Sequence, residues 1–472
     1  MPHTALPPAK THAAATALTP ATAPVRVPVR VPLHDNPMGV IQSLRAAQHN
    51  ILGIVPEQAT HQPIISGRTG ARWHMVMDPA TLREVLLDRV EDYPKSSVTK
   101  SLLRPAIGES LFIAEGAHWR WQRRAAAPAF SHRNVTNLAP VMTAAATRAA
   151  DRIGAAKGIR AVNLFDEMVM TTFDVISDVT FSASEGFDRT AVHRAIDAYV
   201  AEAGRVSLFD ILGVPGWVPR PSRLVAGPAL REMKTLADAA IDARTAAEPG
   251  DIPDLLDLLM AGQDPKTDRR MTPGELRDNL LTFIVAGHET TALTLAWSLY
   301  LCAFDTDVQD AARAEINAVA PDGVITGAHV PKLGHVRRII DEALRLYPPA
   351  AVISRTARRA DTLMGRDIHP GDTVMIPVYA LHRHRALWND PDRFDPDRWL
   401  NRKSVDRYAY LPFGDGPRIC IGASFALQEA VIILATLLAR FRFTPVTGRD
   451  PDPVMILTLR PEGGVWLMAD PV

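Results

Sequence analysis

The sequence predicts a mainly α-helical protein with small β-sheets, built as one large domain. A mostly helical pattern of apolar residues extends over residues 116–260. A second observation is the long apolar segment 279–304, which is too long for a strand. The third is that β-rich runs are few and short, near residues 62–77, Val352 and Val374. Together these patterns favour a helical body to which small sheets are attached.

Composition and charge exclude several classes of protein. The chain has 472 residues, and 52 Lys and Arg residues balance 52 Asp and Glu residues, so no basic footprint for nucleic acid is present. Hydrophobic residues make up 47% and charged residues 22%, which is typical of a globular chain with a sizeable core. The two cysteines, Cys302 and Cys420, cannot form the disulfide framework of a small secreted protein.

The amino-terminal segment predicts a disordered tail over residues 1–34, ahead of a domain over residues 35–472. This segment contains seven prolines and no Asp or Glu. It lacks the continuous apolar stretch of a secretory signal, and its prolines would break the helix of a transit peptide. No apolar stretch of about 18 residues occurs near the start, so we expect no membrane anchor there and a cytoplasmic location.

The first structured elements are a hairpin and a helix. Residues 62–77 predict the hairpin, with Gly67 and Gly70 between two β-rich runs. Asp78-Pro79 then predicts a helix start, because Asp caps a helix and Pro suits its first position. The helical region that follows has expected breaks at Pro128, Gly158 and residues 213–221.

The apolar segment 279–304 predicts a buried central helix. The sequence Thr272-Pro273-Gly274-Glu275 is a capping box that starts it. The segment is long enough to span a membrane, but His288 and Glu289 lie near its middle, where ionisable groups are costly in lipid. The interior of a large protein explains the segment better.

The carboxyl-terminal third alternates helices with short strands. A helix over residues 333–346 is ended by Pro348-Pro349. Strands are expected near Val352 and Val374, followed by an irregular stretch over residues 385–411. A last helix starts near Cys420, and a β-hairpin is expected around Gly463-Gly464.

Several catalytic motifs are absent from the sequence. His288 and Glu289 lack the second histidine of a zinc-protease helix, because residue 292 is alanine. His382 and His384 have no clustered Cys or carboxylate partners that would indicate zinc. Neither a phosphate-binding loop nor a dinucleotide fingerprint is present, so we expect no flavin or nicotinamide domain in this chain.

Cys420 is the strongest candidate for chemistry. A lone cysteine is most often a small core residue, and Cys302 inside the apolar helix fits that description. Cys420 instead follows a glycine-rich turn and Arg418, and it precedes a helix, so backbone amides would favour its thiolate. No histidine lies nearby to make it a catalytic nucleophile, which favours a metal ligand.

Five motifs around this residue resemble those of the cytochrome P-450 family and occur in the family's order. They are Phe413-x-x-Gly416-x-Arg418-x-Cys420-x-Gly422, Glu342-x-x-Arg345, PDRFDPDRW (391–399), AGHETT (286–291) and Trp119-x-x-x-Arg123. The resemblance covers essentially everything after the tail. It implies the fold of that family, with a long central helix over a haem b group and Cys420 as its axial ligand.

The resemblance also implies roles for residues around the haem. The residues expected to contact the cofactor are Trp119, Arg123, Ala286, Arg355, Phe413, Arg418 and Gly422, of which the three arginines would neutralise the propionates. Glu342, Arg345 and Arg393 would form a buried structural triad. Glu289 and Thr290 resemble the family's acid–alcohol proton relay for dioxygen activation, which favours a monooxygenase.

The substrate is expected to be lipophilic, of the fatty acid, terpene or steroid class. The resemblance implies that the apolar stretch 208–218 forms a lid over the pocket, and exposed apolar loops often mark binding surfaces. By their positions, apolar residues would line that pocket, namely Phe112, Phe283, Val285, Val352, Ile456 and Leu457.

Because no reductase domain is visible, electrons would come from a ferredoxin or flavodoxin with its NAD(P)H reductase. Arg120, Arg124 and Arg133 could bind such an acidic donor, although an ordinary solvated helix face explains them equally well. The protein is expected to be a monomer. Alternatives left open are a peroxygenase or isomerase on the same fold, a haem sensor without turnover, and a membrane protein.

Overall fold

The structure is a computed structural model that describes residues 27–35, 38–69, 71–155, 161–180, 227–246 and 253–472. The expected breaks at Gly158 and residues 213–221 and the expected lid 208–218 lie outside these residues. The helices are α1 (Val40–His49), α2 (Pro79–Arg83), α3 (Ser97–Ile107), α4 (Gly116–Ala126), α5 (His132–Asn137), α6 (Ala139–Ala155), α7 (Leu164–Thr180), α11 (Gly227–Ala246), α12 (Leu255–Ala261), α13 (Pro273–Phe304), α14 (Thr306–Val319), α15 (Gly334–Leu346), α16 (Val378–Leu381) and α17 (Ala423–Arg440). The strands are β1 (Ile64–Thr69), β2 (Ala71–Val76), β3 (Ala161–Asn163), β4 (Ile353–Thr356), β5 (Asp361–Leu363), β6 (Arg366–Ile368), β7 (Thr373–Ile376), β8 (Phe441–Pro445), β9 (Asp452–Met455), β10 (Leu459–Glu462) and β11 (Trp466–Pro471). This composition confirms the predicted mainly α fold with small sheets.

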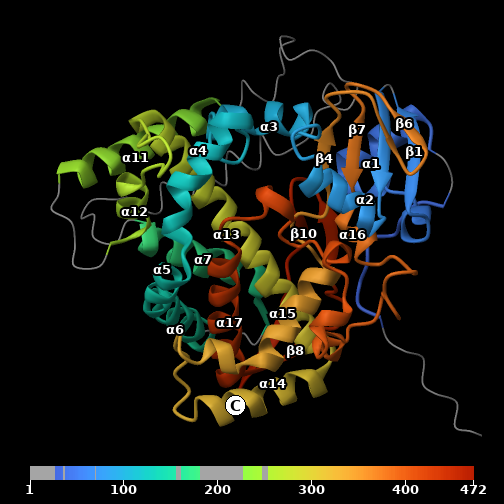
Figure 1. Cartoon of the computed structure of the whole chain (residues 1–472). Coiled ribbons are helices and arrows are strands. Elements are labelled where there is room, and N and C mark those ends of the chain that lie inside the picture. The colour runs from blue at the N-terminus through green and yellow to red at the C-terminus, as the bar shows by residue number, and fades with distance from the viewer. Residues whose placement is uncertain (1–26, 36–37, 70, 156–160, 181–226, 247–252) are drawn as a thin grey trace, which may run out of the picture.

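Helix α13 crosses the middle of the molecule, with α4–α7 and α11–α12 on one side and most strands on the other (Figure 1). The predicted capping box starts it: the Thr272 side chain accepts a hydrogen bond from the Glu275 amide, and the Glu275 carboxylate accepts one from the Thr272 amide. Nearly all its residues from Asn279 to Ala303 are buried against α7, α15 and α17. The prediction of a buried central helix is therefore confirmed.

Helix α17 is the one helix in the described part of the chain that is long and apolar enough to cross a membrane. Two observations indicate its place in the fold. Its apolar window is 67% buried inside the protein, and it packs against α6, α13, α14 and α15. Burial on several sides is what a core helix requires.

The largest sheet in the described part of the chain has the strand order β1-β2-β7-β4. The expected hairpin is present, because β1 and β2 pair antiparallel with Ile64 opposite Val76. Strand β7 joins β2 in parallel, and β4 pairs antiparallel with β7, with Ile353 opposite Ile376. The chain before β4 passes from α15 into the sheet, which positions Val352 and Arg355 near the middle of the molecule.

The hairpin expected around Gly463-Gly464 is wrong. Strand β10 pairs with β9, whereas β11 crosses to a different sheet with the order β3-β11-β8. Both glycines have positive φ values, 78° and 85°, which turn the chain away from β10. A Cβ atom on Gly464 would lie 2.4 Å from the Asn163 side chain, so only glycine fits this crossing.

The predicted tail is wrong for residues 27–34, while residues 1–26 lie outside the described residues. Val29 and Val31 are fastened to the core through the hydroxyl groups of three tyrosines. The Val29 amide donates to Tyr300 Oη (3.1 Å), Tyr347 Oη donates to the Val29 carbonyl (2.6 Å), and the Val31 amide donates to Tyr379 Oη (2.9 Å). Prolines keep this segment extended, so its backbone groups are free to pair with side chains.

A buried ion pair fixes the end of α15. Glu342 and Arg345 have fully buried side chains, and Arg345 Nη2 lies 2.7 Å from Glu342 Oε1. The prediction of Arg393 as the third member is wrong. Its side chain is exposed, and Arg393 contributes only its backbone carbonyl, which accepts a hydrogen bond from Arg345. Arg398 takes the place instead, with Nε 3.4 Å from Glu342 Oε1. Trp399 Nε1 donates to Glu342 Oε2 at 3.0 Å.

The triad can be tested by urea unfolding of three variants monitored by circular dichroism. Glu342→Gln should lower the free energy of unfolding by about 3–5 kcal/mol, because it leaves Arg345 buried without a counter-charge. Arg398→Ala should lower it by about 1.5–3 kcal/mol through lost charged hydrogen bonds. Arg393→Ala is the matched control, with an expected change within about 0.5 kcal/mol. An equal loss in Arg393→Ala and Arg398→Ala would contradict the observed assignment.

Candidate active site

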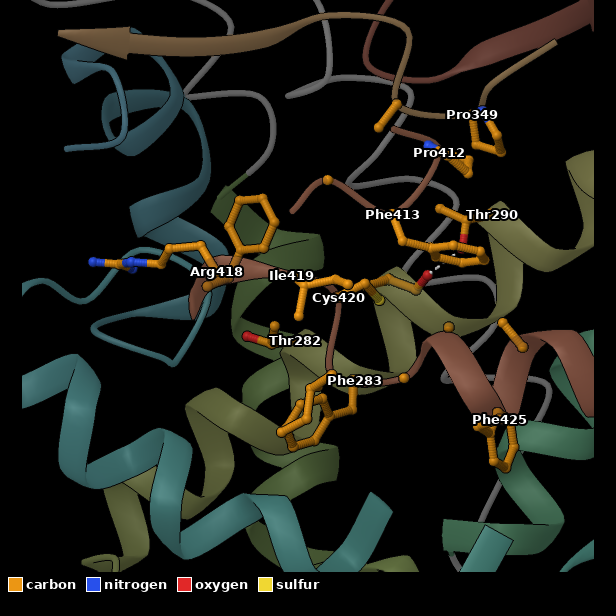
Figure 2. Close-up of a pocket in the computed structure, with 18 of the residues that line it drawn as sticks. Thr282, Phe283, Thr290, Pro349, Pro412, Phe413, Arg418, Ile419, Cys420 and Phe425 are labelled. Atoms are coloured by element: carbon orange, nitrogen blue, oxygen red, sulfur yellow. Dashed lines mark hydrogen bonds between the residues drawn. The ribbon is translucent and has the colours of Figure 1, made fainter. Parts of the chain in front are cut away.

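An apolar cavity of about 390 Å³ lies between α13, α17, α4, β4 and the loop that carries Cys420. It brings together residues that are far apart in the sequence (Figure 2). The predicted cofactor and oxygen residues that line it are Trp119, Arg123, Ala286, Thr290, Arg355, Phe413, Arg418, Cys420 and Gly422. Three predicted substrate residues, Phe112, Phe283 and Val352, line it as well.

Cys420 lies at the end of a tight loop just before α17. Its backbone amide donates to the Phe413 carbonyl at 3.0 Å. Gly416, within this loop, has a φ of 71°, and a Cβ atom there would lie 2.1 Å from the Leu86 carbonyl oxygen. Only glycine therefore allows the loop to pack this closely. The helix begins at Ala423 rather than at Cys420, so the thiol precedes it by three residues.

The environment of the Cys420 thiol acts on its pKa in two directions. Burial raises the pKa, because an enclosed thiolate loses its hydration. A backbone hydrogen bond from Gly422 and the positive charges of Arg123 and Lys95 oppose this rise. The net direction of the pKa shift is upward, while the backbone amide acts in the direction that the sequence analysis predicts. Cys302, in contrast, is buried in α13, and burial raises its pKa to about 12.

Four cationic side chains surround the cavity: Lys95, Arg123, Arg355 and Arg418. Burial is the largest cause that lowers the pKa of each one, and neighbouring like charges add to the effect at Lys95, Arg355 and Arg418. The pKa of Arg355 falls to about 10. The pocket thus concentrates positive charge that is poorly stabilised by the protein itself.

Acidic residues do not compensate this charge fully. Arg418 forms an ion pair with Glu115, donates to the Ala114 carbonyl at 2.7 Å and stacks over Trp119. Among the described lining residues the one acid is Asp415, and it pairs with Arg407 at 2.5 Å. No ion pair of Arg123 or Arg355 occurs within the described ranges. The cavity therefore suits a ligand that carries negative charge at this end.

Lys95 was missed by the sequence analysis. It lies in a short polar stretch before α3, where no motif or periodicity distinguishes it. Its ammonium group lies 3.4 Å from the centre of the Phe112 ring, and its backbone amide donates to Glu115 Oε1 at 3.0 Å. Other lining residues without a sequence signal are apolar or hydroxyl side chains, including Phe130, Ile176, Thr282, Thr294 and Phe425.

Thr290 and Glu289 do not face the cavity together. Successive residues of a helix point about 100° apart, so only one of two neighbours can face a given side. Thr290 lines the cavity, and its Oγ1 donates to the Ala286 carbonyl at 2.8 Å (Figure 2). Glu289 is absent from the described lining residues and instead binds β10. Its Oε1 accepts hydrogen bonds from Arg460 Nε at 2.6 Å and from the Thr458 hydroxyl.

The prediction is wrong for three pocket residues, Val285, Ile456 and Leu457, because they do not line the described cavity. Val285 lies on α13 one position before Ala286, on a different face of the helix. Ile456 and Leu457 lie in the bend between β9 and β10. Thr458 of this bend and Arg460 of β10 bind Glu289, which does not line the described cavity. Phe283, in contrast, lines the cavity as predicted. Its ring packs edge-to-face against Phe130, with the two ring centres 5.1 Å apart.

No group of three or more His, Cys, Asp or Glu side chains that could hold a bare metal ion occurs in the described part of the chain. The ring nitrogens of His382 are instead engaged in the core: Nε2 accepts from the Leu411 amide at 2.9 Å, and Nδ1 lies 3.1 Å from the Arg345 carbonyl. Burial lowers the pKa of His382 to about 3, so this side chain is neutral. A lone thiol thus remains the candidate metal ligand.

Comparisons with known proteins agree with this site. The family model described as Cytochrome P450 matches residues 38–468. Cyclooctatin synthase of Streptomyces melanosporofaciens is 33% identical over 406 residues, which cover 85% of this chain and 88% of that protein. Cyclooctat-9-en-7-ol 5-monooxygenase of the same organism is 33% identical, covering 82% and 84% of the two chains, and a cytokinin hydroxylase of Arabidopsis thaliana is 31% identical, covering 90% and 85%. The chain therefore belongs to the cytochrome P450 family and is a monooxygenase-type oxidoreductase of that family.

Proposed function

We propose that this enzyme inserts one oxygen atom from O2 into a lipophilic small molecule, using haem b held by Cys420. The observation that carries the proposal is the combination of one thiol with four cations that line an apolar cavity. A protein-bound cation that is dehydrated without a partner is unfavourable, so this arrangement calls for an anionic ligand. Haem b has two carboxylates and an iron that accepts a thiolate, and therefore fits both features.

The cations are assigned to the carboxylate end of the cofactor. Arg123, Arg355 and Arg418 were predicted for this role, and Lys95 joins them because its depressed pKa indicates the same deficit of negative charge. The Trp119 ring packs against the Arg418 guanidinium at 4.2 Å and holds it in place. Binding of two carboxylates would restore charge balance at this end of the cavity.

Cys420 is assigned as the residue that would hold the haem iron through its thiolate. When bound, a thiolate-ligated haem supplies the activation of O2, because the thiolate donates electron density that favours O–O cleavage. The protein contributes the Gly422 amide, which donates a hydrogen bond to the sulfur, and the positive potential of Arg123 and Lys95. These groups would help a bound iron to keep the sulfur in its charged form.

Thr290 is assigned to proton handling in the cavity. Its hydroxyl hydrogen is committed to the Ala286 carbonyl, so its oxygen can accept a hydrogen bond from a water molecule or a protonated reactant in the cavity. Glu289 reaches this space only by leaving its ion pair with Arg460. The acid–alcohol relay is therefore proposed with Thr290 as the group in contact and Glu289 as a more remote acid.

The lipophilic substrate is supported by the lining of the cavity. Phe112, Phe283, Val352 and other apolar side chains make up most of the wall, and the polar threonines of α13 bond to their own helix. Two relatives support the same type of chemistry, since one is named as a 5-monooxygenase of cyclooctat-9-en-7-ol and another as a cytokinin hydroxylase. Fatty acid, terpene and steroid remain the proposed classes.

Electrons are proposed to come from a ferredoxin or flavodoxin and its NAD(P)H reductase. The predicted docking residues are not equally available, because Arg124 pairs with the buried Asp264 at 2.6 Å and Arg120 pairs with Glu91 at 2.5 Å. Arg133 forms no ion pair within the part of the chain described, so it is the strongest of the three for an acidic donor. A monomeric, cytoplasmic enzyme stays a prediction.

The axial ligand can be tested with Cys420→Ser in the purified protein. We expect loss of the red-shifted Soret band of the reduced carbonyl complex, because a hydroxyl is a much weaker donor than a thiolate. Cys302→Ala is the matched control and should keep the parent spectrum, since Cys302 is buried in α13 away from the cavity. A parent-like spectrum in Cys420→Ser would disprove the assignment.

The role of Thr290 can be tested by measuring product formed per NAD(P)H consumed. Thr290→Ala should lower this ratio on the order of 10²-fold, with hydrogen peroxide released instead, because a positioned proton donor or acceptor contributes about that much. Thr436→Ala is the control, since Thr436 makes the same bond to its own helix, to Ile432 at 2.8 Å, outside the lining residues described. Unchanged, peroxide-driven turnover in Thr290→Ala would favour a peroxygenase.

The substrate class can be tested by titrating the ferric protein with fatty acids, terpenes and steroids. We expect the Soret band to shift toward high spin with one class, because a fitting apolar ligand displaces water from the iron. A charged, water-soluble analogue of each compound is the control and should produce no shift. A haem spectrum that responds to none of the three classes would contradict the proposed lipophilic substrate.

A further inference from the structure

The loop between α3 and α4 forms one wall of the cavity. Its residues Leu111 and Phe112 line the cavity, and Phe112 is 37% exposed, facing into this space together with the Lys95 ammonium. The loop packs tightly on α13, because a Cβ atom at Gly108, which has a φ of 52°, would overlap the Asp278 carboxylate. The position of Phe112 therefore depends on how this loop is held against α13.

Asn279 of α13 holds the loop at Leu111. Its side chain is fully buried, and Oδ1 accepts a hydrogen bond from the Leu111 amide at 2.9 Å. Both Nδ2 hydrogens are used as well, for Gln122 Oε1 at 2.9 Å and for the Glu275 carbonyl at 2.8 Å. A backbone N–H on one side and a carbonyl on the other leave only one orientation of this amide.

Gln122 of α4 holds the loop two residues earlier, at Glu109. It is also fully buried, and Nε2 donates to the Glu109 carbonyl at 2.9 Å. Nε2 also lies 2.7 Å from His118 Nε2, and Trp121 Nε1 lies 3.3 Å from His118 Nδ1. Together Asn279 and Gln122 bind the backbone on both sides of Ser110 and connect the loop, α4 and α13 into one unit.

We propose that Asn279 and Gln122 are positioning residues that set the place of Phe112 and thereby the selectivity of the cavity for bulky ligands. Neither amide is among the residues that line the described cavity, so they act through the loop backbone. Two buried amides that are hydrogen-bonded to each other and to the loop backbone specify a single geometry, because a shift leaves a polar group unpaired. The inference rests on the proposed function, in that the cavity is taken to receive ligands of the haem iron.

The test uses the haem-loaded protein and two probes, imidazole and 4-phenylimidazole, whose binding shifts the Soret band. Imidazole needs only the iron, whereas the phenyl ring also needs the apolar wall. The variant is Asn279→Asp, which has the same shape but places an oxygen against Gln122 Oε1 and the Glu275 carbonyl. We expect the Kd of 4-phenylimidazole to rise roughly 10-fold while that of imidazole stays within about 2-fold.

Two further variants separate positioning from general destabilisation. Gln309→Glu is the matched control, because Gln309 is an equally buried amide that donates to the Cys302 and Phe443 carbonyls outside the described cavity lining. It should change the ratio of the two Kd values little. In a Phe112→Ala background, Asn279→Asp should no longer change this ratio, because the group that it positions is gone. Asn279→Ser, without the repulsive oxygen, replaces Asn279→Asp if that variant does not fold.

The outcomes distinguish this inference from the proposed function. A normal imidazole shift with an unchanged ratio in the Asn279 variant would overturn the positioning role alone. Equal weakening of both probes, or an undiminished effect in the Phe112→Ala background, would also overturn it. If the parent protein showed no Soret response to imidazole, the proposed haem site itself would fail, and this inference with it.

Discussion

The structure depends on an arrangement that places four cations around one thiol with too little negative charge to balance them. Lys95, Arg123, Arg355 and Arg418 come from four separate segments, and burial opposes the charge of each. Bringing them together weakens the folded state unless an anion binds between them. A ligand that binds only the folded chain returns this free energy as stability, so cofactor binding and folding are linked in this protein.

Helix α13 distributes three tasks over its faces. Thr290 faces the cavity, Glu289 faces β10, where it binds Arg460, and Asn279 near its start holds the loop that carries Phe112. This division is possible because residues of a helix point in directions about 100° apart and because the helix is buried on nearly every side. One rigid helix therefore fixes the distances between Thr290, Glu289 and the loop that carries Phe112.

Sequence reasoning predicted the features that rest on local chemistry. The fold class, the central helix with its capping box, the first hairpin and the residues of the Cys420 loop all follow from short-range patterns. Sequence reasoning failed where contacts between distant segments determine which residue pairs or which strand joins a sheet. Arg393 and Arg398 both lie in the PDRFDPDRW motif, each after a Pro-Asp pair. Only the packing of Arg398 against Glu342 distinguishes them. Gly463-Gly464 indicates a turn, but not that β11 leaves for another sheet. No motif or periodicity in the sequence identifies Lys95 as a residue of the cavity.

The state of the buried polar groups separates structural from functional residues in this fold. Glu342 with Arg345, and Asn279 with Gln122, have their hydrogen bonds satisfied by protein, and such groups fix geometry. The cations around Cys420 are half-buried or, at Arg355, buried, but they lack sufficient counter-charge, and such groups call for a ligand. The contrast holds within single elements: on α4, Gln122 is satisfied and Arg123, the next residue, is not. A sequence pattern places both residues on the helix, but only the packed structure shows which of them is still missing a partner.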